Sequence, residues 1–232
     1  LGRGDPKAAT GFAQAALQLT ILFSLFVTLI SMLFTNPLLQ FFALNDAETY
    51  NSARIYMRIT CGLILFSFLS QVLTGLFTAQ GDSKTPLKAN FFGLILNMIL
   101  DPLLVLGVGP FPRLEVVGAA VATVTAQIIV LLILVAEILR DHGEANVLRK
   151  IRLLSRPDII CVKGVFRIGV PTALQGSLYC IISMVLTRMV ASFGDGAIAV
   201  QRVGGQIESL SWNTADGFGS ALNAFMGQNY GA

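Results

Sequence analysis

The feature that most limits the fold of this chain is a run of residues near its start, from Phe12 to Phe34, that contains no charged side chain. An apolar run of this length is enough for one helical crossing of a bilayer. In lipid, every backbone N–H and C=O group must find its partner inside the protein, so such a run favours a helix. The whole sequence agrees, because 54% of its residues are hydrophobic and 12% are charged, against about 25% charged residues in an average soluble domain. The sequence therefore predicts an all-α, polytopic membrane helix bundle.

About six stretches of the chain have the length and character of membrane helices. In chain order, the expected spans are residues 12–34, 59–79, 89–109, 117–136, 168–193 and 198–225. We expect Asn36-Pro37 to end the first span, and residues 38–58 to form a connector with a short interfacial helix. The sixth span is the most polar, and we expect its polar residues to share one inward face because many of them follow a 3-4 spacing.

The longest polar region divides the chain into two parts. Between residues 148 and 156, apolar side chains alternate with Arg and Lys, which is typical of a basic amphipathic helix on an anionic membrane surface. Most of the sixteen Lys and Arg residues fall on the same side of this layout, which by the positive-inside rule is the cytoplasmic side. We therefore expect four helices of a first half in residues 1–136, a cytoplasmic amphipathic linker in 137–167, and two helices of a second half in 168–232.

Two polar residues lie one helical turn apart inside the third expected span. Asn97 and Asp101 share one face of a helix because they are four positions apart. An ionised side chain at the middle of a bilayer costs roughly 2.5–3.5 kcal/mol, so Asp101 should face the protein interior or a water-filled cavity. Pro102 lacks an N–H, which leaves the carbonyl oxygen of Met98 without its helical donor. The pattern predicts an oxygen-rich pocket for a proton or a hard cation, and the alternative is a structural hydrogen bond that braces a proline kink.

The fourth expected span carries small residues at a spacing of four: Gly118, Ala122 and Ala126. Such a stripe lets a neighbouring helix approach closely. We therefore expect a tight helix contact along this face.

The sequence contains none of the motifs that would indicate an enzyme. It has no GxxxxGK[ST] phosphate loop and no Ser-His-Asp or paired-carboxylate constellation. Its single histidine, His142, has no second His or Cys at ligand spacing, and its three cysteines do not suggest a disulfide framework. We expect a protein that is not an enzyme, needs no cofactor beyond a coupling ion, and binds no nucleic acid.

Five short strings, in this order, resemble the multidrug and toxic compound extrusion (MATE) transporters. They are QGDSKTP at 80–86, NMILDP at 97–102, GAAVAT at 118–123, RIGVP at 167–171 and GQNYGA at 227–232. The family is built from two six-helix lobes related by a pseudo-repeat. The resemblance implies that this chain is an internal piece with the third to sixth helices of the first lobe and the first two of the second.

The resemblance implies a secondary active antiporter that exports cationic or amphipathic compounds in exchange for H⁺ or Na⁺. It assigns the cation or proton site of the first lobe to Asp101, Asn97 and Thr123, and Na⁺ at Asp101 is the one metal it allows. The family also places an acid on its first helix, which this chain does not contain. Some members carry a Glu on the first helix of the second lobe, where this chain has Tyr179.

Polar residues inside the spans are further candidates for a substrate cavity. They are Gln71, Thr74, Gln175, Tyr179, Gln206 and Glu208. The resemblance also implies a multi-pass protein of the inner (plasma) membrane, in contact with lipids and monomeric at full length. Two alternatives stay open: a lipid-linked oligosaccharide flippase of the same superfamily, which needs a more cationic cavity, and a non-transporting truncated fragment.

The expected layout predicts the accessibility of single cysteines in a cysteine-free background. A cysteine at Thr85 or Asn146 should react with an impermeant thiol reagent from the cytoplasmic side only, and one at Gly196 from the outside only, because the basic loops stay inside. Labelling of all three positions from the same side would contradict the layout.

Overall fold

The computed structural model describes residues 5–41, 47–108, 112–141, 148–151, 153 and 155–230, and every regular element in these ranges is a helix. In chain order the helices are α1 (Pro6–Phe41), α2 (Ala47–Gly62), α3 (Ile64–Ala79), α4 (Lys84–Leu106), α5 (Glu115–Arg140), the 3₁₀ turn η1 (Leu148–Lys150), α6 (Ile159–Ala191) and α7 (Asp195–Asn229). The chain forms two compact units, of which one is Pro6–Pro157 and the other contains Asp158–Ala232. We describe each unit by itself.

Four of the described helices, α1, α4, α5 and α6, are long and apolar enough to cross a membrane. The pair α2 and α3 adds a fifth span if the two are taken as one helix with a bend of 44°. Helix α7 covers the sixth expected span, but its composition is too polar to meet the same criterion. The expectation of an all-α polytopic bundle is confirmed, with four to five apolar spans in the described residues.

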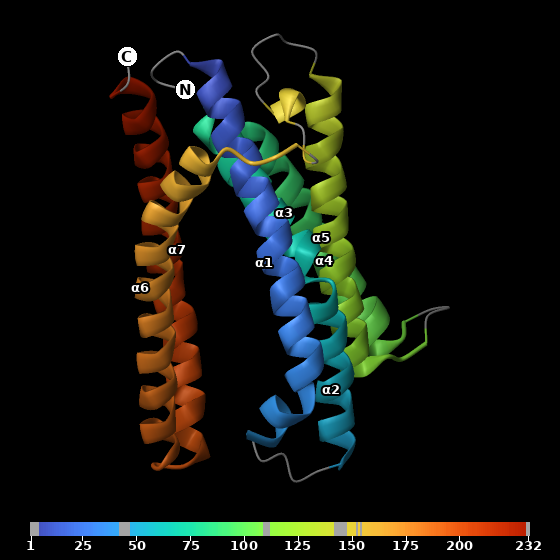
Figure 1. Ribbon diagram of the computed structural model, residues 1–232. Helices are drawn as coiled ribbons and strands as arrows, with labels where there is room; N and C mark the ends of the chain where they lie inside the picture. The colour runs from blue at the N-terminus through green and yellow to red at the C-terminus, as the bar shows by residue number, and fades with distance from the viewer. Residues whose placement is uncertain are drawn as a thin grey trace. The chain divides into compact units, whose positions relative to one another are not determined.

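The first unit is a helix bundle in which α4 and α5 form the most extensive pair (Figure 1). Helix α1 packs on α2 and α3, and both of these also pack on α5. The apolar core lies among α1, α3, α4 and α5 and includes Leu17, Leu73 and the fully buried Leu134. On the outer face of α1, side chains such as Leu22 and Phe26 remain more than half exposed, as expected of surfaces that lipid covers.

Helices α4 and α5 approach closely because both have glycines at their contact. A Cβ atom at Gly118 would lie 2.6 Å from the backbone carbonyl oxygen of Leu104, and one at Gly93 would lie 3.6 Å from the backbone oxygen of Ala126. Ala122, midway along the stripe, is fully buried. The close contact expected along Gly118, Ala122 and Ala126 is therefore confirmed, and its partner is α4.

The junction between α2 and α3 leaves backbone groups without helical partners. Leu63 separates the two helices, and the Thr28 hydroxyl on α1 donates to the carbonyl oxygen of Cys61 over 3.0 Å. A Cβ atom at Gly62 would meet the terminal carbon of Met32 at 2.7 Å, so α1 also lies close to the bend. Helix α1 thus satisfies a carbonyl group that has no water partner inside a membrane.

Two glutamines of α1 hold the segment that follows η1. Gln14 Nε2 donates to the hydroxyl of Ser155 over 2.8 Å. Gln18 Nε2 donates to the backbone oxygens of Leu153 and Ser155, both over 2.7 Å. These contacts fix the end of the first unit to the N-terminal half of α1.

The loop before α4 is ordered by a carboxylate cap. Asp82 Oδ1 accepts from the backbone N–H groups of Lys84 and Thr85, each over 3.1 Å. A hydrogen bond from the Thr85 side chain, with these N–H groups and the nearby Lys84 charge, holds the pKa of Asp82 below its usual value, and burial opposes the shift only in part. The capping, ionised form is therefore present at neutral pH and is lost only as the pH falls through the lowered pKa.

The expected end of the first span was wrong. Helix α1 runs through Asn36-Pro37 and ends at Phe41. A proline removes one helical hydrogen bond, and here α1 continues past it for about one turn. Part of the expected connector, residues 47–58, belongs to α2, which packs on α1 and α5.

The linker also differs from its expected form. Of the expected linker 137–167, residues 137–140 belong to α5 and 159–167 to α6. Residues 148–150 form the short turn η1, and Leu148 is buried in the core of the first unit. Packing against α1 and α5 holds this segment to the protein. Residues 142–147, with Asn146 and His142, and residues 152 and 154 lie outside the described ranges.

The second unit is a hairpin of α6 and α7, which run antiparallel and side by side (Figure 1). Asp158 caps α6 through a bond from the N–H of Ile160 over 2.9 Å, so the helix starts before the expected Ile168. Gly194 makes the turn with a φ of +98°, a conformation that favours glycine. Apolar side chains such as Leu178 and Ile182 are more than half exposed in this unit.

Replacement of Ala122 by Leu should destabilise the first unit. The α4–α5 contact has no room for a larger side chain, and overpacking of this kind costs about 1–3 kcal/mol. Thermal unfolding in detergent measures the effect, with Ala136→Leu on the exposed part of α5 as the matched control. Equal midpoints for the two variants would contradict the packing described here.

Candidate functional site

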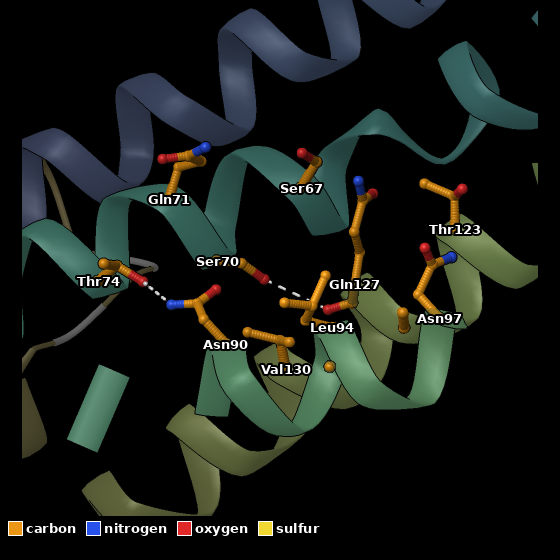
Figure 2. A pocket seen from close by; sticks show the side chains of 12 residues that line it. Ser67, Ser70, Gln71, Thr74, Asn90, Leu94, Asn97, Thr123, Gln127 and Val130 are labelled. Carbon is orange, nitrogen blue, oxygen red and sulfur yellow. Dashed lines mark hydrogen bonds between the residues drawn. The ribbon is translucent and has the colours of Figure 1, made fainter. Parts of the chain in front are cut away.

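A cavity of about 300 Å³ lies between α3, α4 and α5 in the first unit (Figure 2). Its lining consists of Ser67, Ser70, Gln71 and Thr74 from α3, Asn90, Gly93, Leu94 and Asn97 from α4, and Thr123, Ala126, Gln127 and Val130 from α5. None of these lining residues is charged, and most carry a hydroxyl or an amide. The cavity can therefore recognise a ligand by hydrogen bonds without burying a charge of its own.

Hydrogen bonds between the helices fix the polar wall of this cavity. The Ser70 hydroxyl donates to the backbone oxygen of Phe66 over 2.9 Å and also lies 3.3 Å from the backbone oxygen of Gln127, which links α3 to α5. Asn90 Nδ2 donates to the backbone oxygen of Pro86 over 2.8 Å. It also approaches Thr74 Oγ1 at 3.4 Å, which links α4 to α3 (Figure 2). The wall is thus built from side chains whose positions are set by neighbouring helices.

Asn97 connects the cavity with the carboxylate of Asp101. With its amide nitrogen toward the carboxylate, Asn97 Nδ2 donates to Asp101 Oδ2 over 3.2 Å, and Asn97 Oδ1 accepts from the backbone N–H of Thr123 over 3.3 Å. The opposite amide orientation would place oxygen against oxygen and nitrogen against nitrogen. The site therefore favours one orientation of the amide while Asp101 is ionised.

The second oxygen of Asp101 has no hydrogen-bond partner. Asp101 Oδ1 is buried, and no donor among the described residues reaches it. Asp101 is not one of the residues that line the cavity, so Asn97 lies between this carboxylate and the cavity space. An unpartnered buried carboxylate oxygen can accept a proton or coordinate a hard cation.

The structure brings the expected ion-site residues together. It places the expected cavity residues in two different units. Asn97, Asp101 and Thr123 form one group, but Thr123 takes part through its backbone N–H. Gln71 and Thr74 line the cavity of the first unit, whereas Gln175 and Gln206 line neither of the two cavities described here.

Among the amide side chains of the cavity wall, sequence reasoning missed two, Asn90 and Gln127. A signal was available for both. Asn90 lies seven positions before Asn97, and Gln127 lies four positions after Thr123, so each shares a helix face with a residue that was selected.

Tyr179 and Glu208 belong to a second cavity, of about 630 Å³, between α6 and α7. In this cavity Trp212 Nε1 donates to Glu208 Oε1 over 3.1 Å. The two groups of candidate cavity residues thus lie in separate units.

The fold and the site define a class: a multi-pass membrane helix bundle with a polar cavity next to a buried carboxylate. The MatE family model matches residues 1–103 and 171–232, which is more than half of the chain. The chain belongs to the MatE family, and the resemblance to MATE transporters is confirmed.

Several relatives match the chain over almost its whole length. The FAD transporter of Shewanella oneidensis is 29% identical and is matched over 100% of this chain and 50% of its own length. The probable multidrug resistance protein NorM of Thermotoga maritima is 29% identical over 100% of this chain and 49% of its length. The probable multidrug resistance protein YoeA of Bacillus subtilis is 28% identical and is matched over 97% of this chain and 48% of its own length. The chain therefore spans about half the length of the curated relatives it matches.

Solved structures show the same fold. A MATE crystal structure in the bent conformation aligns with a TM-score of 0.77 at 21% identity, covering 97% of this chain and 53% of that one. An inward-facing multidrug resistance MATE transporter aligns with a TM-score of 0.64 at 20% identity, covering 86% of this chain and 50% of that one. At these identities the likeness concerns the fold alone.

Replacement of Asn97 by Leu should destabilise the first unit by about 1–3 kcal/mol, because a buried carboxylate loses its donor. Thr123→Val should change stability little, since the backbone N–H that Asn97 uses is retained. Thermal unfolding of both variants in detergent at neutral pH measures the difference. A larger loss for Thr123→Val than for Asn97→Leu would show that the hydroxyl of Thr123, and not its N–H, supports the site.

Proposed function

We propose that the chain forms part of a secondary active efflux antiporter, which exchanges amphipathic or cationic compounds for H⁺ or Na⁺ at Asp101. The observation that carries this proposal is the position of Asn97, which lines the cavity and also donates to Asp101. A single side chain thus contacts both the space for a substrate and the group for an ion.

The hydrogen-bond rules of the amide supply the coupling. When Asp101 is ionised it accepts from Asn97 Nδ2. A proton on Oδ2 would make this atom a donor, and a cation that takes the Asn97 oxygen as a ligand needs that oxygen turned inward, so in either case Asn97 turns its oxygen toward the site.

That rotation points Nδ2 of Asn97 at the N–H of Thr123, where two donors oppose each other. Ion-loaded and ion-free sites therefore need different contacts between α4 and α5. Because both helices line the cavity, ion binding changes the cavity and biases the packing of the lobe.

The chemistry of the cavity supports organic substrates that carry hydrogen-bonding groups. Its wall offers amides and hydroxyls next to apolar side chains such as Leu94 and Val130. Relatives named as probable multidrug resistance proteins and as an FAD transporter support the export of such amphipathic compounds. We place the protein in the plasma membrane, as a monomer at full length, with lipid against its apolar faces.

The cavity favours efflux over flipping of a lipid-linked oligosaccharide. A pyrophosphate group needs cationic ligands, and none of the lining residues is Lys or Arg. The buried acid beside the cavity would repel such an anion. Flippase activity is therefore the weaker proposal for this site.

Replacement of Asp101 by Asn tests the proposal. The amide keeps the size and the hydrogen-bonding capacity of the acid but has no titratable charge, so gradient-driven efflux should fall to the background of empty vesicles. Export of a fluorescent amphiphile from energised vesicles, under a pH gradient and under a sodium gradient, measures the loss. Asp82→Asn is the matched control, because Asn also caps helices well and Asp82 lies outside the spans.

Undiminished efflux by Asp101→Asn would reduce this residue to a structural brace of α4.

The alternative of a fragment that does not transport is tested in the same assay. Vesicles that carry the 232-residue chain are compared with vesicles that carry a full-length relative. Gradient-driven export by the relative alone would support the fragment alternative.

A further inference from the structure

The cavity in the second unit is lined by charged and aromatic residues that the proposed ion exchange at Asp101 does not involve. It lies between α6 and α7 and has a volume of about 630 Å³. In contrast to the uncharged cavity of the first unit, its lining contains a basic residue, Arg202, an acidic residue, Glu208, and the aromatic side chains of Tyr179 and Trp212.

The open space of this cavity is bordered by a glycine. Gly205 lies in the middle of the α7 face that lines the cavity, and a Cβ atom added there would meet no atom within 4 Å. This glycine therefore does not serve a close helix contact, in contrast to Gly118 in the first unit. It leaves room in the wall between α6 and α7.

Opposite charges lie on the two sides of this open space. Arg202 and Glu208 are each three positions from Gly205, so their backbones are about 9 Å apart along the helix axis at 1.5 Å per residue. The two described side chains form no ion pair with one another. A ligand with a positive and a negative group at that separation can satisfy both.

Hydrogen bonding and aromatic side chains add direction to the site. Trp212 Nε1 donates to Glu208 Oε1 over 3.1 Å, which orients the carboxylate and leaves Oε2 for a ligand. Tyr179 on α6 and Trp212 on α7 offer aromatic rings in the same cavity. Aromatic rings stack on other rings and attract cationic groups.

We propose that the cavity between α6 and α7 binds an aromatic zwitterion, with its ammonium group at Glu208, its carboxylate at Arg202 and its ring over Gly205. A simple cation would meet the like charge of Arg202, and a simple anion that of Glu208, so the pair of charges selects for a ligand that carries both. As a substrate site the inference rests on the proposed transport function, but binding can be measured without transport.

The single tryptophan of the chain makes the site directly observable, because fluorescence of Trp212 reports on this cavity alone. Three probes share one ring: 4-(aminomethyl)benzoate is the zwitterion, benzylamine the cation and benzoate the anion. Added to the whole chain in detergent, the zwitterion should change the fluorescence saturably at a concentration about tenfold below that of either single ion, as a second charge-assisted contact implies.

Two adjacent glycines provide matched variants. Gly205→Leu fills the open space and should abolish the response, whereas Gly204→Leu should keep it, because Gly204 does not line the cavity and also has no atom within 4 Å of an added Cβ. Glu208→Gln should remove the preference for the zwitterion over benzoate, and Arg202→Gln should remove its preference over benzylamine.

Equal affinity for the three probes, no saturable response, or equal effects of the two Leu variants would overturn the proposal. If circular dichroism shows that Gly205→Leu unfolds α7, the two charge variants decide. The outcome is independent of the antiport test, since loss of binding here together with Asp101-dependent efflux would remove this site and leave the proposed function intact.

Discussion

The close approach of α4 and α5 is the contact on which the candidate ion site depends. Gly93 and Gly118 have no side chains where the opposite helix passes, and a Cβ atom at Gly118 would overlap the backbone of Leu104. This short separation lets the amide of Asn97 on α4 reach the backbone N–H of Thr123 on α5. The same two helices supply most of the cavity wall, so ion site and cavity share one helix interface. A change in that interface alters both.

The interface between α4 and α5 lies inside membrane spans, and this position determines the chemistry of Asp101. An acid inside a span is costly unless it has a partner. Asp101 has one oxygen bound by Asn97 and one that no donor among the described residues reaches. We infer that a proton on the first oxygen, or a cation that takes the Asn97 oxygen as a ligand, would reverse what the carboxylate requires of Asn97. The proposed alternating access needs two arrangements of this kind. The second unit contributes a cavity of opposite character, with Arg202 and Glu208 in its wall.

The parts of the fold that follow from local pattern could be predicted from the sequence. Apolar runs predicted the helices α1, α3, α4, α5 and α6, and the spacing of Gly118 and Ala122 predicted a tight contact. The spacing of Asn97 and Asp101 predicted their proximity, because one helical turn is a local quantity. The end of α1 could not be read from Pro37, since a proline costs one hydrogen bond and tertiary packing can outweigh that loss. The burial of Leu148 could not be predicted either, because an amphipathic pattern does not state whether lipid or protein covers its apolar side.

The roles of backbone groups were also outside the reach of the sequence. The resemblance assigned Thr123 to the site by residue type, but the structure uses its backbone N–H, which every residue except proline has. The central claim is that Asp101 exchanges an ion within the first unit. Infrared difference spectroscopy on the protein in lipid, across a pH titration and with sodium added, measures this exchange directly. The account predicts a carboxyl C=O band that responds to pH or to sodium in the wild type and is lost in Asp101→Asn, and identical difference spectra for the two proteins would contradict it.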